Sequence, residues 1–226
     1  MFCASWELPQ ALLWPRNLTI WSDITVAEAV GMCYAKGAER RVCMGKCFNI
    51  IADCKPQRHF MVNIDGRLRQ VKEMVERGDY FTVNRARQYG KTTMLKALAR
   101  FLAGDYTVLS LDFQQLSHSD FETEHAFVKA FARMLLNKYA PNGRMPADVL
   151  EKLRLFADEV GGSFTLGDLF GCFGEWCQKA AAPLVLMVDE VDNASNNQIF
   201  LDFLARLRNG YIERDEIPAF QSVILA

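Results

Sequence analysis

The segment Y-F-T-V-N-R-A-R-Q-Y-G-K-T-T, residues 80–93, decides the fold that this sequence predicts. Its first four residues read as a β-strand, and its last four lead into the helix-like stretch 94–101. A strand that enters a helix through a glycine turn and Lys-Thr can wrap the phosphates of a nucleotide, because loop amides and the positive end of the helix dipole point at the anion. We therefore expect this segment to bind ATP or GTP.

Within this segment, Lys91 is expected to reach the outer phosphates, and the hydroxyl of Thr92 to help bind Mg²⁺. The full phosphate-binding pattern is G-x-x-x-x-G-K-[ST], and this chain has Arg85 at the position of the first glycine. Arginine tolerates positive φ poorly. Either the loop follows a different backbone path or binding is impaired. A different backbone path is favoured, because Arg85 and Arg87 would then add positive charge beside the phosphates. The alternative for both arginines is that they are solvated loop charges.

A second motif lies downstream, where the apolar run Pro183–Val188 ends in Asp189 and Glu190. A run that is apolar at every position suits a parallel strand covered on both faces. Acidic residues at its carboxyl end lie where α/β folds bind ligands, so Asp189 is expected to hold the Mg²⁺ shell and Glu190 to polarise the attacking water. The alternative is a buried strand with a solvated acidic end.

The composition is that of an ordinary globular protein. Half of the 226 residues are hydrophobic, and the net charge of −1 gives no electrostatic case for direct nucleic-acid binding. No stretch approaches the roughly 18 apolar residues of a membrane span, and the N-terminus lacks the pattern of a signal peptide, so we expect a cytoplasmic protein.

Seven cysteines at irregular spacing argue against a disulfide scaffold. Cys43, Cys47, Cys54 and His59 allow a zinc site, but their spacing favours free thiols.

Residues 1–44 break any regular period and predict an N-terminal extension of uncertain structure. From residue 45 to residue 226, strand-like and helix-like stretches alternate, which predicts an α/β fold with a mostly parallel sheet. The expected strands are 80–84, 106–112, 183–188 and 219–226, and the expected helices are 67–77 (with Asp65 as N-cap), 92–102, 121–139, 147–158, 166–180 and 196–213. Because the last strand stops at Ala226, we expect a domain that is truncated at its C-terminus.

Three strings resemble the AAA-ATPase-like family of predicted bacterial ATP-binding proteins, a group of P-loop NTPases. They are N-R-A-R-Q-Y-G-K-T-T (84–93), L-S-L-D-F-Q (109–114) and V-L-M-V-D-E-V-D (185–192), and the resemblance extends over about residues 45–226. It implies a three-layer P-loop NTPase fold, in which the variant Walker A loop leads to Lys91 and the Walker B strand ends at Asp189. Relatives often continue into a nuclease-like C-terminal region, which this sequence does not contain.

The resemblance also implies roles for individual residues. Lys91 would contact the β- and γ-phosphates, Thr93 would lie near the α-phosphate, and Glu190 would be the general base. Thr92 and Asp189 would hold Mg²⁺, while Asp112 and Asp192 would either assist that site or cap local structure. The implied nucleotide-binding set is Arg87, Gln88, Tyr89, Gly90, Lys91, Thr92 and Thr93.

The leading functional prediction is Mg²⁺-dependent ATP hydrolysis that drives or switches an attached effector. The alternative is a nucleotide-binding regulatory module with little or no turnover. A small-molecule kinase would need an acid–arginine acceptor pocket, of which the sequence gives no sign, and an α/β domain without a nucleotide is the remaining alternative.

Overall fold

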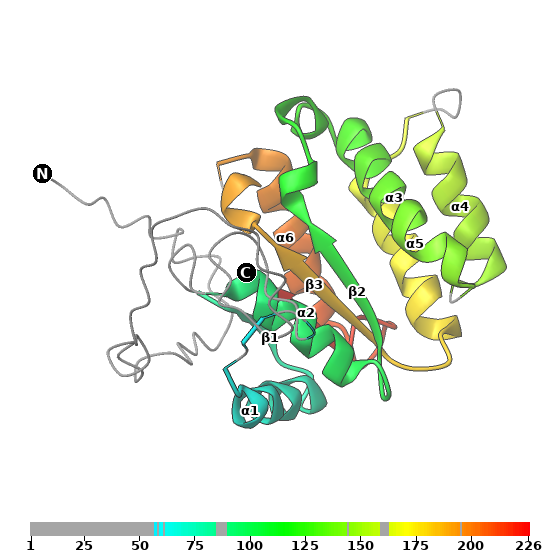
Figure 1. The fold of residues 1–226 in the computed structure, drawn as a ribbon. Coiled ribbons are helices and arrows are strands. Elements are labelled where there is room, and N and C mark those ends of the chain that lie inside the picture. The colour runs from blue at the N-terminus through cyan, green and yellow to red at the C-terminus, as the bar shows by residue number, and fades with distance from the viewer. Residues whose placement is uncertain are drawn as a thin grey trace, which may run out of the picture.

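The computed structural model describes residues 57, 59–60, 62–84, 90–143, 145–158, 163–194 and 196–226. The expected extension 1–44, the three cysteines of the zinc alternative and the loop residues 85–89 lie outside this set. The described residues form a central sheet with helices on both faces, which confirms the predicted three-layer α/β fold (Figure 1). None of the helices in these ranges has the length and apolar character needed to cross a bilayer.

The central sheet is parallel throughout, with the strand order β1-β4-β3-β2. The chain passes from β1 at one edge to β2 at the other, and then returns through β3 to β4 in the interior. In such sheets, ligands bind beside the carboxyl ends of the strands where the direction of winding reverses, which here is next to β1. The strands are β1 (Tyr80–Thr82), β2 (Thr107–Asp112), β3 (Leu184–Asp189) and β4 (Ser222–Leu225).

Helices before and after β1 cover one face of the sheet, and the later helices cover the other, with one helix packed outside them. The connection from β1 to β2 runs one way across the sheet, and the connections from β2 to β3 and from β3 to β4 run the other way. Because such crossovers are right-handed, connections in opposite directions place their helices on opposite faces. The first face carries α1 (Asp65–Glu76) and α2 (Lys91–Leu102), the second carries α3 (Glu124–Tyr139), α5 (Leu166–Lys179) and α6 (Gln198–Ile212), and α4 (Ala147–Ala157) packs against α3 and α5. Short 3₁₀ turns are η3 (Phe113–Gln115), η4 (His118–Phe121), η5 (Ala140–Asn142) and η6 (Val191–Ala194).

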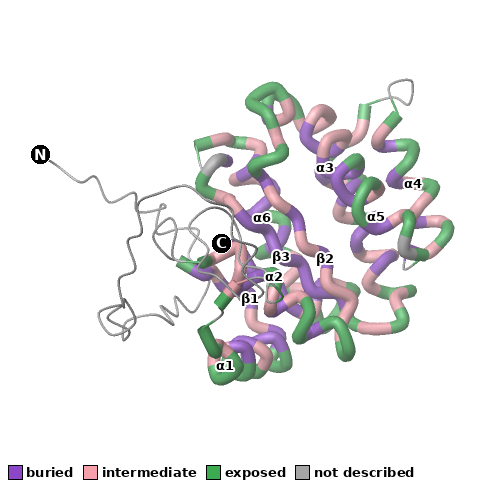
Figure 2. The backbone as a smooth tube through the Cα atoms, in the orientation of Figure 1, coloured by how far each residue is buried: buried purple, intermediate pink, exposed green. Residues whose placement is uncertain are grey.

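The strand β3 lies in the interior of the molecule, and all six of its residues are buried (Figure 2). Leu186 and Val188 belong to the core under α3, α5 and α6, whereas Val185 and Met187 belong to the core under α1 and α2. Successive side chains of a strand point to opposite faces, so a strand between two helical layers must be apolar at every position. The continuous apolar run in the sequence therefore has a direct structural cause.

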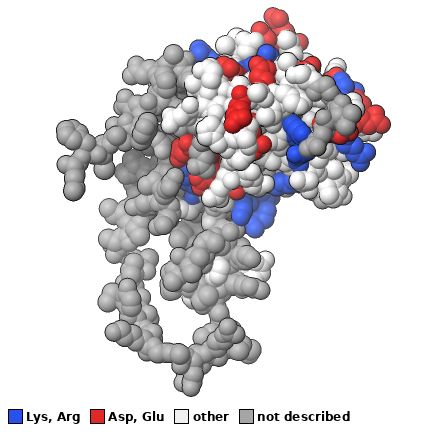
Figure 3. All heavy atoms as spheres, turned by 90° about the horizontal axis from the view of Figure 1, so that it is seen from above, with Lys and Arg blue, Asp and Glu red and all other residues white. Residues whose placement is uncertain are grey.

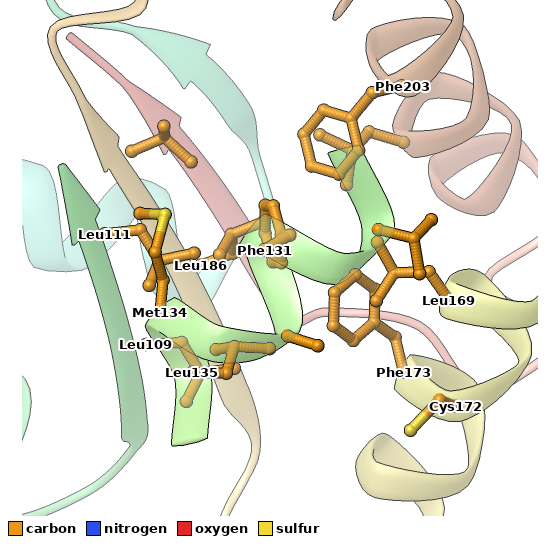
Figure 4. Close-up of a cluster of buried hydrophobic side chains, with 14 of the residues drawn as sticks. Leu109, Leu111, Phe131, Met134, Leu135, Leu169, Cys172, Phe173, Leu186 and Phe203 are labelled. Carbon is orange, nitrogen blue, oxygen red and sulfur yellow. The ribbon is translucent and has the colours of Figure 1, made fainter. Parts of the chain in front are cut away.

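The larger core is rich in phenylalanine. Phe113 lies at its centre, with ring centroids 5.7–6.5 Å from those of five other phenylalanines. Figure 4 shows Phe131 of α3, Phe173 of α5 and Phe203 of α6 meeting above the strands. Aromatic pairs at such separations stabilise the core beyond the area that they bury, so this layer stabilises the packing of the helices on β2 and β3.

Side chains of α3 cover the edge strand β2 at Ser110. The backbone N–H of Ser110 donates to the hydroxyl of Tyr139 at 2.5 Å, and the Lys138 ammonium donates to the Ser110 carbonyl. These bonds occupy groups that a neighbouring chain could otherwise pair with. Burial raises the pKa of Tyr139, so its hydroxyl stays protonated.

Several predicted boundaries are wrong by a few residues, each for a local reason. Asp65 is not an N-cap: α1 already includes it, and its N–H donates to Asn63 Oδ1 at 2.9 Å. The helix α3 begins at Glu124 rather than at residue 121, because the hydroxyl of Thr123 caps it by accepting from Ala126 N–H at 3.1 Å. The helix α6 likewise begins at Gln198, after a side-chain cap, and β1 ends at Thr82.

Candidate nucleotide site

Gly90 forms the junction between the β1 segment and α2. It is the N-cap of α2, with φ 79° and ψ 25°, a left-handed conformation that favours glycine. A Cβ built at this position would meet no atom of the described residues within 4 Å. Arg85, Arg87, Gln88 and Tyr89, which precede it, lie outside the described residues.

The first turn of α2 presents groups that suit an anion. It consists of Lys91, Thr92 and Thr93, which are partly buried, and it contains no acidic residue. The first amides of an α-helix have no partner inside the helix, and the helix dipole makes this end positive. A glycine N-cap offers no side chain to satisfy them. The residues present therefore fit a phosphate chain.

Lys91 points toward the carboxyl end of β3. Its Nζ lies 3.8 Å from Oδ2 of Asp192 in η6, and the Lys91 side chain is only 10% exposed whereas that of Asp192 is 66% exposed. The ammonium group is thus held close to the acidic segment that follows β3. The two motifs, distant in sequence, meet at one edge of the sheet.

Asp189 is the last residue of β3 and is buried, at 6% exposure. Its Oδ1 accepts from the N–H of Glu190 at 3.0 Å. The strand end is fixed further because Ala226 N–H donates to the Val188 carbonyl at 2.9 Å, and Val191 N–H donates to the Ala226 carbonyl at 3.1 Å. This buried carboxylate is therefore positioned by backbone contacts on both sides.

Glu190 has an unusual backbone, with φ 59°. Among the described residues other than glycine, it is the one with positive φ. For an L-residue this conformation costs roughly 1–2 kcal/mol. Strain of this kind is concentrated at functional sites, where the surrounding structure imposes it. The turn changes the chain direction directly after Asp189, so the two acidic residues do not continue the alternation of the strand.

Asp112 and Asp192 have different partners in the structure. Asp112 ends β2 in register with Asp189, and its Oδ1 accepts from Gln114 N–H at 2.9 Å, so it caps η3. Asp192 instead pairs with Lys91. Sequence alone could not predict the partner of Asp192, because its pair with Lys91 joins positions 101 residues apart (192 − 91).

Asp189 and Thr92 are the residues that would hold a divalent cation. Mg²⁺ usually keeps several waters and is bound through one or two carboxylates together with substrate phosphates. The donors fit this pattern, since they combine one buried carboxylate with one hydroxyl at the helix start. The described residues contain no group of three or more His, Cys, Asp or Glu side chains placed to hold a metal by themselves.

Two comparisons with known proteins bear on this site. A family model described as an AAA-like domain matches residues 59–226, which include both motifs and the whole described sheet. A search of curated proteins returned no match to the sequence.

Proposed function

Since this chain belongs to the family of AAA-like domains, which are of the nucleotide-binding NTPase type, we propose that it binds ATP with Mg²⁺ and hydrolyses it to drive or switch an attached effector. One observation carries the proposal: Lys91 at the start of α2 forms an ion pair with Asp192, three residues beyond Asp189. A cation, a helix N-terminus and a buried carboxylate thereby gather at the carboxyl edge of a parallel sheet, where such folds bind ligands.

In the proposed complex, Lys91 contacts the β- and γ-phosphates and backbone amides of residues 88–92 surround them, with Thr93 near the α-phosphate. Glu190 accepts a proton from a water molecule, whose oxygen attacks the γ-phosphorus. The bond between that phosphorus and the bridging oxygen breaks, releasing ADP and inorganic phosphate. Mg²⁺, when bound at Thr92 and Asp189, would supply positive charge against the phosphate oxygens.

The positive charge that would bind the phosphates is proposed to come from residues of the site and not from the overall charge of the protein. On the face that Figure 3 shows, acidic and basic side chains of the described residues lie interspersed, and the chain as a whole has a net charge of −1. Phosphates would thus be recognised by Lys91 and the α2 N-terminus. Arg85 and Arg87 are proposed to add to this charge from the loop.

The test compares ATP binding by the wild type and by Lys91→Ala, with Lys96→Ala as a matched control on the exposed side of α2. Loss of a charge-assisted contact should weaken binding by about 10- to 100-fold for Lys91→Ala, and Lys96→Ala should bind normally. Equal affinity in all three proteins would remove the phosphate-site assignment.

Turnover is tested separately, because a regulatory module that binds without hydrolysis is the alternative. Glu190→Gln keeps the size of the side chain and removes its basicity. We expect ATP affinity to be retained and hydrolysis to be lost. If the wild type binds ATP but releases no phosphate, the regulatory alternative is correct.

A further inference from the structure

A cavity lies beside the amino ends of the strands, whereas Gly90 and Asp189 lie at the carboxyl ends. It has a volume of about 330 Å³, opens to the surface, and is lined by α5, α6 and the segment 217–220. Tyr80, the first residue of β1, and Phe220, which precedes β4, line its inner end. These residues belong to the amino ends of the strands, so the cavity is separate from the candidate nucleotide site.

The inner surface of the cavity is apolar and chemically inert. Phe173 and Phe220 pack there with ring centroids 5.2 Å apart, and the Tyr80 hydroxyl already donates to the Phe220 carbonyl at 2.8 Å. Burial raises the pKa of the Cys177 thiol, which also lines the cavity, to about 12. The thiol stays protonated near neutral pH and is a poor nucleophile. This wall suits a non-covalent apolar ligand.

One charged group of the lining is left available. Arg206 of α6 is exposed, and its guanidinium lies at the rim of the cavity, where both terminal nitrogens would be 3.7–3.8 Å from a Cβ on Gly167 at the start of α5. Arg206 forms no ion pair or hydrogen bond with any described residue. Of the two carboxylates of the lining, Glu175 is neutralised by its ion pair with Lys152, whereas Glu213 accepts a hydrogen bond from the neutral Asn209 Nδ2 at 3.1 Å and keeps its charge. A guanidinium beside an apolar wall is suited to bind a carboxylate in bidentate fashion.

The chain leaves this cavity open where ordinary side chains would fit. Gly171 and Gly174 of α5 and Gly210 of α6 line it, and none has positive φ. A Cβ at Gly171 would meet nothing within 4 Å, and those at the other two would make ordinary contacts at 3.6 and 4.0 Å. Glycine inside a helix is less favourable than alanine, and packing within the chain does not require it here. The space that these glycines preserve is available to a ligand.

We propose that this cavity binds a small organic anion, with its apolar or aromatic body against Phe173 and Phe220 and its carboxylate on Arg206. The volume lies at the lower end of the range for small-molecule sites, which favours a compact ligand over a helix of a protein partner. The proposal does not depend on nucleotide binding at the carboxyl ends of the strands.

The probes are 1-naphthoate and its neutral isostere 1-naphthamide, titrated into the whole chain by calorimetry. Wild type should bind the carboxylate about tenfold more tightly than the amide, which lacks the charge-assisted contact. Arg206→Gln should abolish that preference, whereas Arg208→Gln, on the same helix but outside the lining, should preserve it.

A second variant tests the location. Gly171→Leu fills the cavity and should weaken both probes by about tenfold or more, while Gly66→Leu, at an open position in α1, should bind as the wild type does. Circular dichroism checks that each variant is folded. The proposal is overturned if wild type binds neither probe, if it binds the amide as tightly as the carboxylate, or if folded Gly171→Leu retains wild-type affinity.

Discussion

Replacing Gly90 with alanine should lower both the stability of the protein and its affinity for the nucleotide. The backbone at Gly90 has φ 79°, and a Cβ there would meet no atom of the described residues within 4 Å, so the cost worked out from these residues is conformational. Holding alanine in a left-handed conformation costs roughly 1–2 kcal/mol. For a protein of this size, that should lower the melting temperature by about 2–8 °C.

The effect on binding follows from the same strain. If the variant relaxes by moving the loop, only a fraction of molecules keeps the α2 amides in place, and the apparent Kd rises in proportion. A strain of 1–2 kcal/mol corresponds to binding that is about 5- to 30-fold weaker. Scanning fluorimetry measures stability, and titration of a fluorescent ATP analogue measures affinity.

Two other glycines provide controls for Gly90→Ala. Gly143 also has positive φ (63°) and open surroundings but lies far along the chain, after η5, whereas Gly104 has open surroundings and no positive φ. Gly143→Ala should therefore lose stability alone, and Gly104→Ala should lose neither stability nor affinity. Wild-type ATP affinity in Gly90→Ala, or equally weakened binding by Gly143→Ala, would contradict a role for the Gly90 turn in the site.

Three further results are expected. Glu190→Gly should relieve the strain at φ 59°, raising the unfolding free energy by up to about 1 kcal/mol, while abolishing ATP turnover; persistent turnover would exclude Glu190 as the base. Burial raises the pKa of Cys172 and Cys177 to about 12, so mass mapping should find both thiols unmodified by iodoacetamide at pH 8 until the protein unfolds. The capping box between Thr165 and Asp168 holds the pKa of the Asp168 carboxyl below its usual range, so its stabilisation is present at neutral pH and is lost as pH falls through the folded-state pKa. Asp168→Ala should thus cost about 1 kcal/mol at pH 7 in urea unfolding and progressively less below about pH 4; a cost that does not depend on pH would contradict the capping role.

The sequence predicted those parts of the fold that depend on local pattern. The apolar run that ends at Val188 identified β3, which the structure buries at every position as expected. Element boundaries were less accurate, because a single side chain such as that of Asn63 or Thr123 decides where a helix begins.

The strand order and the details of the site could not be read from the sequence. A parallel sheet of any order has the same apolar runs, so nothing local places β4 between β1 and β3. The Lys91–Asp192 pair joins residues distant in the chain, and the backbone strain at Glu190 arises from the turn that follows β3. The one feature of the sequence that could have indicated the cavity is the recurrence of glycine within α5, at Gly171 and Gly174.

The most direct test of the central claim is the dependence of ATP affinity on Mg²⁺ in the wild type, Lys91→Ala and Asp189→Asn. Asn at position 189 can still accept the Glu190 N–H, so the local turn should be kept. If one bound Mg²⁺–ATP contacts both motifs, Asp189→Asn should bind ATP normally without Mg²⁺ and fail to tighten when Mg²⁺ is added, whereas Lys91→Ala should bind weakly in both conditions. Wild-type enhancement by Mg²⁺ in Asp189→Asn, or unchanged binding by Lys91→Ala, would contradict a shared nucleotide site at this edge of the sheet.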